Sequence, residues 1–213
     1  MRHATGILLA LILGVTGAAR AADRAGDFDY YVLSLGWSST WCELTGDATG
    51  DPQCDRGRGL TFILHGLWPQ YDSGYPQDCH SDQPDASRSQ TAAMADIMGG
   101  AGLAWHEWKR HGRCSGLSAQ DYFAKARSAY ESVAIPAPFA QVHRHLTLPA
   151  QVIEDAFLEA NPWLSADAVA VTCDHALIAE VRICLTRGLR PRPCGSDVAR
   201  SCSLRDADLP PVR

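Results

Sequence analysis

Alternation and clustering of apolar residues along the chain predict several β-strands. The segment FDYYVLSLGW (28–37) alternates and is rich in β-prone residues, which is typical of a strand. The short apolar run LTFILHGLWP (60–69) predicts a buried strand that Gly66 and Pro69 bring to an end. Near the C-terminus, AVAVTC (168–173) and ALIAEVRICLT (176–186) are separated by a short polar turn and predict an antiparallel pair.

Helical periodicity predicts four helices among these strands. We expect them from Thr91 onward, over 103–112 with an end at Gly112, over 118–133, and over 147–160. Ser118 with Asp121 resembles a capping box, which marks a helix N-terminus. Thr147 as a cap and Pro149 in the first turn mark the start of the last helix.

Strands and helices do not follow a strict strand–helix–strand alternation, so the predicted class is α+β, an antiparallel sheet packed with helices. At 213 residues the chain can bury a real core within one sizeable domain. Residues 43–59 and 70–90 are rich in polar and turn-forming residues and are predicted loops. Because no convincing linker interrupts the rest, we expect a single domain over 23–213.

The first 22 residues have the layout of a secretory signal peptide. Arg2 and His3 precede an apolar run over 7–15, and small residues follow up to a predicted cleavage site near Ala22. The apolar run is too short to anchor the chain in a bilayer. A disordered amphipathic start is the alternative. We therefore expect a secreted or periplasmic protein with no membrane association after the leader is removed.

The charge balance excludes a nucleic-acid binder that is basic throughout. The chain carries 19 Lys and Arg against 24 Asp and Glu, a formal net charge of −5, and loss of Arg2 and Arg20 with the leader lowers it to −7. A polyanionic ligand would have to be held locally, by a few cations in a cleft. Eight cysteines in an exported chain predict four disulfides, although sequence alone permits 105 connectivities.

The stretch HEWKRHGRC (106–114) concentrates titratable side chains. Its two histidines, His106 and His111, are five residues apart, about 140° around a helix, whereas a two-histidine metal site needs a spacing of four. A zinc hydrolase is therefore a poor interpretation. Glu107 and His111, at positions i and i+4, do share a helix face. A carboxylate beside an imidazole suggests proton transfer.

A further histidine, His65, is placed by the pattern at the C-terminal end of a buried strand, a rigid platform that can project a side chain into a cleft. A histidine that is satisfied in the core is the alternative. Two histidines can divide acid and base duties, as RNA cleavage requires. A base removes the 2′-OH proton, the 2′-oxygen attacks phosphorus, and an acid protonates the departing 5′-oxygen. DNA lacks the 2′-OH and cannot react in this way.

Two segments, LHGLWP and HEWKRHGRC, resemble the signature segments of the secreted ribonuclease T2 family, and EVRICL and PRPC resemble its late strand and cysteine. The resemblance implies that His65 is the general acid and His111 the general base. It implies that Glu107 orients His111 or assists at the phosphorane, and that His106 binds the phosphate. Arg110 stands where lysine is usual in the family and is expected to reach the phosphate as well.

The resemblance also implies a base site and a disulfide pattern. Trp68 and Tyr75 would stack on a nucleobase, although Trp68 could equally be a core residue. Gln70 replaces an aspartate of some members, which predicts little or no base preference. The implied disulfides are Cys79–Cys114, Cys173–Cys202 and Cys184–Cys194, which leaves Cys42–Cys54.

The resulting hypothesis is an exported endoribonuclease that cleaves single-stranded RNA to 2′,3′-cyclic phosphate ends. It would need no metal or cofactor, would not cleave DNA and would be a monomer. The alternative is a relative of the same fold that binds RNA or a partner and needs no catalysis. The presence of His65, Glu107 and His111 argues against that alternative.

Overall fold

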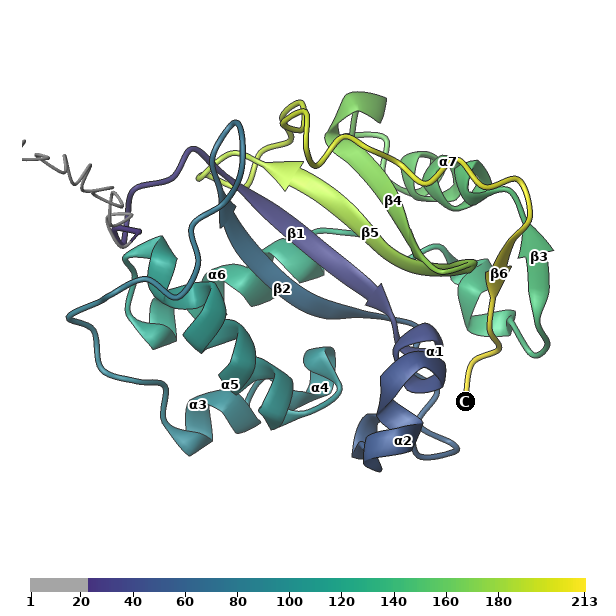
Figure 1. Cartoon of the computed structure of the whole chain (residues 1–213), viewed down its shortest axis with the longest axis horizontal. Coiled ribbons are helices and arrows are strands. Elements are labelled where there is room, and N and C mark those ends of the chain that lie inside the picture. The colour runs from purple at the N-terminus through teal and green to yellow at the C-terminus, as the bar shows by residue number, and fades with distance from the viewer. Residues whose placement is uncertain (1–22) are drawn as a thin grey trace, which may run out of the picture.

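A computed structural model describes residues 23–213, so the expected leader over 1–22 lies outside the described residues. The described chain forms one six-stranded sheet in the order β2-β1-β5-β6-β3, and β4, which lies off this path, also pairs with β5 (Figure 1). The strands are β1 (Tyr30–Trp37), β2 (Phe62–Gln70), β3 (Leu146–Leu148), β4 (Val169–Asp174), β5 (Leu177–Leu185) and β6 (Ala207–Leu209). All pairings except that of β5 with β6 are antiparallel, as the α+β prediction required.

Seven α-helical segments surround this sheet in the described part of the chain. They are α1 (Ser38–Trp41), α2 (Asp47–Thr49), α3 (Arg88–Ala92), α4 (Ala95–Met98), α5 (Ala101–Arg110), α6 (Ala119–Glu131) and α7 (Ala150–Ala160). Figure 1 shows α3 to α6 together beside β2, with α1 and α2 beyond the end of β1 and α7 beside β4. None of the helices in 23–213 has the length and apolar character that crossing a bilayer requires.

Strand β1 lies between β2 and β5. One of its faces packs into the main core, and the other lies on the opposite side of the sheet. Tyr31, Leu33 and Leu35 belong to the main core, which also contains Trp108 and Tyr122 from the helices. The alternate residues of β1 point to the opposite face, because successive side chains of a strand alternate. The predicted strand over 28–37 is therefore confirmed.

A β-bulge interrupts the pairing of β1 with β2. Ser34 pairs with Gly66 and Leu35 pairs with Leu64, so His65 has no partner residue on β1. The expectation that His65 ends a strand is wrong, because β2 continues to Gln70. A bulge leaves one extra residue and changes the direction of its side chain, so the irregularity marks His65 as a special position.

Two further local predictions differ from the structure. The predicted loop over 43–59 contains a π-helical turn (Cys42–Gly46), α2 and a 3₁₀ turn (Pro52–Cys54). Helix α5 ends at Arg110 rather than at Gly112, since the chain turns sharply under the Trp108 ring, where a Cβ on Gly112 would overlap it.

The predicted cap of α7 is also wrong. Thr147 lies in β3, where its hydroxyl donates to Asp208 of β6, and Pro149 takes the N-cap position. Thr147 is part of a strand rather than a helix cap because β3 pairs with β6, which is distant in the sequence. By contrast, Ser118 caps α6 as predicted, because its hydroxyl accepts the backbone N–H of Asp121.

Four disulfides link the eight cysteines: three are the pairs that the family resemblance implied, and the fourth is the pair left by elimination. They are Cys42–Cys54, Cys79–Cys114, Cys173–Cys202 and Cys184–Cys194. The Cys79–Cys114 bridge joins the loop after β2 to the turn after α5. The two sequence segments that carry the histidines are thus covalently tied.

We predict that removal of Cys79–Cys114 (C79A/C114A) lowers the free energy of unfolding by about 4 kcal/mol, since the bridge restricts the unfolded chain. The bridged residues are 35 positions apart, and those of Cys173–Cys202 are 29 apart, so C173A/C202A is a matched control with a similar expected loss. Denaturant unfolding without reductant measures the free energy of unfolding of both variants. NMR shifts at His65 and His111 should move in the first variant alone, and equal shifts in both would contradict the tying role.

Candidate active site

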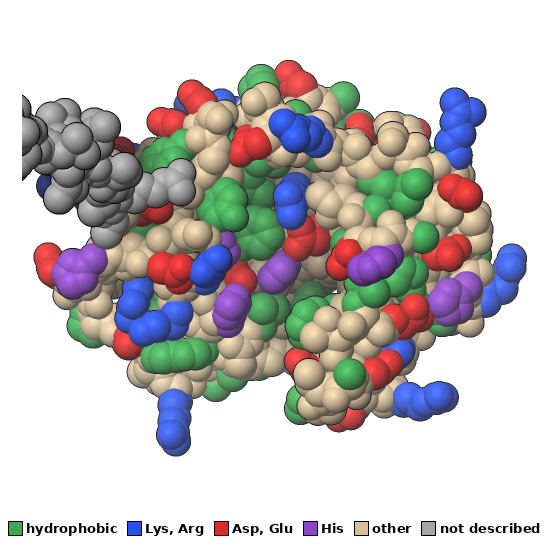
Figure 2. All heavy atoms as spheres, viewed as in Figure 1, with side chains coloured by type: hydrophobic (Ala, Val, Ile, Leu, Met, Phe, Trp, Pro, Cys, Tyr) green, Lys and Arg blue, Asp and Glu red, His purple; other side chains and the backbone are tan. Residues whose placement is uncertain are grey.

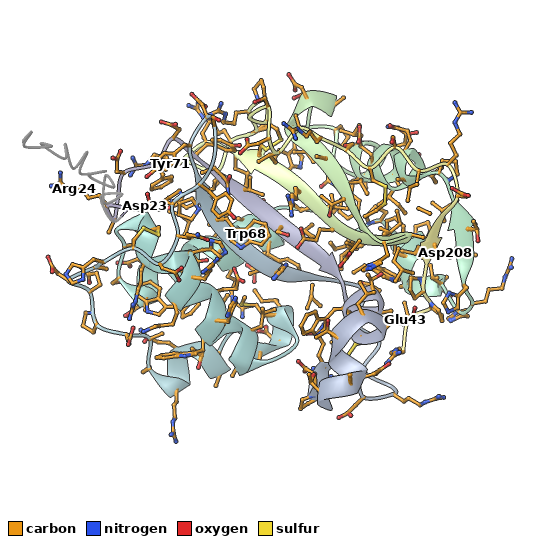
Figure 3. All side chains as sticks on the ribbon, viewed as in Figure 1. Asp23, Arg24, Glu43, Trp68, Tyr71 and Asp208 are labelled. Atoms are coloured by element: carbon orange, nitrogen blue, oxygen red, sulfur yellow. A yellow bond between two sulfur atoms is a disulfide. The ribbon has the colours of Figure 1, made fainter. Side chains whose placement is uncertain are left out.

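The predicted site residues meet in one cleft of about 500 Å³ on the face of the sheet opposite the main core. The cleft is lined by residues of β1, β2, α5, the turn after α5, β5 and two loops: Val32, His65, Trp68, Gln70, Tyr75, Gln77, His106, Glu107, Arg110, His111, Glu180, Arg182, Asp197 and Val198. Figure 2 shows histidine, acidic and basic side chains gathered in a hollow near the middle of this face. Trp68 lies over the strands near the middle of the same view (Figure 3).

His65 is held between two carboxylates. Its Nδ1 lies 2.5 Å from Oε1 of Glu180, and its Nε2 lies 3.6 Å from Oε1 of Glu107. Burial alone would lower the pKa of His65, but the hydrogen bond and charge of Glu180, with the charge of Glu107, outweigh it and raise that pKa. The protonated imidazolium is therefore favoured at His65.

Glu107 is a buried carboxyl group on α5, with 1% of its side chain exposed. Its Oε2 accepts a hydrogen bond of 2.6 Å from the indole Nε1 of Trp68. Burial raises the pKa of Glu107 to about 7, although the charge of His65 and the hydrogen bond from Trp68 oppose the rise. Gly66 makes this contact possible, because a Cβ at that position would overlap both Glu107 Oε2 and Trp68 Nε1.

His111 follows the last residue of α5, and its ring lies beside the Trp68 ring, as the ring of His65 does. The ring centroids of Trp68 and His111 are 5.3 Å apart, and those of Trp68 and His65 are 5.2 Å apart. Burial, together with the positive charges of His65, Arg110 and His106, lowers the pKa of His111 to about 3. The neutral imidazole is therefore favoured at His111.

The structure corrects one predicted pairing. Glu107 and His111 are joined by the backbone hydrogen bond from His111 N–H to the Glu107 carbonyl. Among residues 23–213, however, no side-chain hydrogen bond or ion pair links them, because the carboxylate turns toward Trp68 and His65. His111 caps the end of α5 with a φ of −124°, which departs from helical values, so its side chain is not directed as in a continuous helix. Nδ1 of His111 is buried without a hydrogen-bond partner in the described chain.

Both predicted phosphate-binding residues line the cleft. His106 is exposed on α5, one residue before Glu107. The Arg110 guanidinium forms an ion pair of 2.5 Å with Oδ2 of Asp78, the residue that precedes the Cys79–Cys114 bridge. Asp78 thus holds Arg110 at the rim while the guanidinium keeps other N–H groups for a ligand.

The predicted base-site residues also line this cleft. Trp68 is half-buried beside the rings of His65 and His111, and Gln70 is buried at the end of β2. Tyr75 is 51% exposed, with its ring centroid 6.4 Å from that of His111. Two aromatic rings and one amide therefore line the same cleft.

Two site residues on β5, Glu180 and Arg182, were missed by the sequence analysis. Nε and Nη2 of Arg182 lie 2.9 and 2.8 Å from Oε2 of Glu180, and the guanidinium lies 5.4 Å from the centre of the Trp68 ring. The sequence signal is a pair of charges two residues apart in an otherwise apolar strand, which places both on one face. Which strand neighbours β1 could not be read from the sequence.

No group of three or more His, Cys, Asp or Glu side chains in the described range is arranged to hold a metal ion. The acidic and imidazole groups of the cleft contact one another, Trp68 and arginines. The arrangement brings two imidazoles of opposite protonation preference, a carboxyl group that titrates near neutrality and two guanidinium groups together in one cleft. Such a set can transfer protons to and from a bound anion.

The sequence profile of the Ribonuclease T2 family matches residues 28–194. The chain belongs to this family. It is 42% identical over 118 residues to a ribonuclease of Aeromonas hydrophila, an alignment that covers 54% of this chain and 52% of that protein. The chain spans about half the length of the first curated relatives it matches.

Solved structures share the fold. The RNase-related protein from Calystegia sepium superposes with a TM-score of 0.66 at 21% identity, over 87% of this chain and 97% of that one. RNase NT in complex with 5′-AMP superposes with a TM-score of 0.59 at 22% identity, over 87% of this chain and 99% of that one.

We predict that G66A breaks the Trp68–Glu107 hydrogen bond, since the added Cβ occupies its space. The free energy of unfolding should fall by about 1–3 kcal/mol, the cost of leaving a buried polar group unpaired. G102A is the control, because a Cβ on Gly102 of α5 meets no atom within 4 Å. The indole N–H resonance of Trp68 reports the bond. An unshifted resonance in G66A would refute the steric argument.

Proposed function

We propose that this protein is an endoribonuclease that cleaves single-stranded RNA by transphosphorylation to 2′,3′-cyclic phosphate ends, without a metal ion or cofactor. One observation carries the proposal. The rings of His65 and His111 both lie beside Trp68 in one cleft, and their pKa values are shifted in opposite directions. Membership of the Ribonuclease T2 family and the ribonuclease names of its relatives support it.

The proton transfers follow from these two shifts. Neutral His111 accepts the 2′-OH proton while the 2′-oxygen forms a bond to phosphorus. The bond from phosphorus to the 5′-oxygen breaks, and protonated His65 supplies the proton that the leaving oxygen needs. A bound phosphate places negative charge beside His111 and offsets the cations that lower its pKa, so the base becomes stronger once the substrate is bound.

The remaining polar groups would stabilise the phosphorane. Glu107, with a pKa of about 7, is largely protonated in the acid range and can then donate a hydrogen bond to a phosphoryl oxygen. His106 and Arg110 line the same cleft and would supply further donors to that oxygen. Of the two roles considered for Glu107, assistance at the phosphorane fits its contacts better than orientation of His111.

Base binding would rest on stacking. Trp68 and Tyr75 present ring faces, which every nucleobase can use, and the Gln70 amide can pair with several bases. We therefore expect the protein to show little base preference.

The domain over 23–213 would act as a monomer after export and removal of 1–22, and N-terminal sequencing of the exported protein would identify the cleavage site.

The proposal predicts that H65A and H111A each lower kcat/KM on RNA by at least about 10³-fold, since each loses one proton-transfer group. H143A is the control, because His143 is exposed and outside the cleft. The assay uses homopolymer RNAs and matched DNA in EDTA and identifies the ends that form. RNA binding with unchanged cleavage in both variants would refute the mechanism. Cleavage that EDTA abolishes would point to a metal enzyme instead.

The pKa shifts also predict a bell-shaped dependence of kcat/KM on pH. Protonation of His111 sets the acid limb, and a lowered pKa moves this limb to lower pH. Deprotonation of Glu107 near pH 7 and of His65 sets the alkaline limb, so the rate falls above neutrality. Steady-state rates from pH 3 to 10 test this. A rate that keeps rising above pH 9 contradicts the assignment.

A further inference from the structure

The ring nitrogen of His65 that faces away from Glu107 meets a second carboxylate, on β5. Nδ1 of His65 lies 2.5 Å from Oε1 of Glu180, and only 12% of the Glu180 side chain is exposed. Because water competes weakly at such a site, the contact can fix the proton on Nδ1. Nε2 then remains as the nitrogen that exchanges a proton within the cleft.

We infer that Glu180 is a positioning residue for the general acid: it holds His65 with Nδ1–H on its own carboxylate and Nε2–H directed to the leaving oxygen. The inference rests on the proposed function and deepens it. When the bond from phosphorus to the 5′-oxygen breaks, the Nε2 proton moves to that oxygen. The imidazole becomes neutral and keeps its Nδ1–H on Glu180.

Arg182 fixes Glu180 in turn. Its guanidinium contacts Oε2 through Nε at 2.9 Å and Nη2 at 2.8 Å, so each oxygen of the Glu180 carboxylate has a partner. Arg182 also lies over the Trp68 ring. A carboxylate that is held by an arginine has few alternative orientations, which limits the movement of His65.

The backbone explains how side chains of β2 and β5 meet across β1. Gly36 of β1 pairs with Glu180 on one side and with Ile63 on the other, so no β1 side chain separates the two strands here. A Cβ on Gly36 would lie 3.8 Å from the Cβ of His65, which shows that both project from the same face. The bulge at His65 brings its ring to this gap.

Several charged or titratable groups face His65. They are Glu180 and Arg182 from β5, His106 and Glu107 from α5, and His111 from the turn after α5. The two carboxylates favour the imidazolium and the cations oppose it. Glu107 is farther away and its pKa is raised to about 7, whereas the pKa of Glu180 is lowered by His65 and Arg182 despite burial. Glu180 therefore keeps its negative charge over the acid range, where Glu107 loses it.

The test is E180Q, which keeps the size of the side chain and an acceptor oxygen but removes its charge. E159Q is the matched control, since Glu159 is exposed on α7, far along the chain from the cleft residues. On RNA we expect E180Q to lower kcat by about 10–100-fold. Its alkaline limb of kcat/KM should move at least one pH unit lower, because His65 loses its proton more easily. E159Q should change neither.

A second substrate separates positioning from a structural role. In a nucleoside 3′-(4-nitrophenyl phosphate) the leaving phenolate needs no proton, so E180Q should cleave it within about threefold of the unmodified protein. An equal loss on this ester and on RNA would overturn the inference. An unchanged alkaline limb would overturn it as well.

The unmodified protein provides a readout that does not depend on how the variant folds. The ¹⁵N shifts of the His65 ring should show a proton on Nδ1 in the neutral form and a pKa above that of an ordinary histidine. A proton on Nε2 instead would refute the inference. Failure of the proposed function is distinguishable, because H65A would then cleave RNA as well as the unmodified protein does.

Discussion

The site depends above all on the hydrogen bond between the Trp68 indole and the buried Glu107 carboxyl group. It joins β2 to α5 inside the cleft and places the indole ring beside both His65 and His111. Gly66 leaves the space for this contact. Because the bond is short and Glu107 is buried, it fixes the indole ring against both imidazoles. Loss of the contact would leave an acid group buried without a partner, which is costly.

The electrostatics of the cleft come from pairs of opposite charge rather than from the acidic chain as a whole. Glu180 and Asp78 each hold one arginine, Arg182 and Arg110, and both guanidinium groups line the cleft. The exposed pair of Asp78 with Arg110 contributes little to stability, but both pairs fix where a cation lies. An acidic protein can therefore present ordered positive charge to an anion locally.

Covalent and backbone constraints support the same geometry. The Cys79–Cys114 bridge brings the loop that carries Asp78 to the end of α5, where Arg110 lies. The bulge in β2 turns His65 toward the gap above Gly36. Each constraint limits the movement of a side chain that lines the cleft: the bridge acts on Arg110 and the bulge on His65.

Local pattern determined much of this protein. Alternation and apolar runs located β1, β2 and the β4–β5 pair, because strand formation depends on the residues themselves and on burial. The two histidine segments were recognisable as one site by their resemblance to a family. The cysteine pairing followed from the same resemblance, since spacing alone leaves many connectivities open.

Tertiary structure decided the rest. The bulge at His65 depends on the register between β1 and β2, and the turn of Glu107 toward Trp68 depends on how α5 packs on β2. Glu180 reaches His65 because β5 lies on the far side of β1, a neighbour that no local pattern specifies. Strand order and register are contacts between distant parts of the chain, so their consequences for individual side chains appear only in the folded molecule.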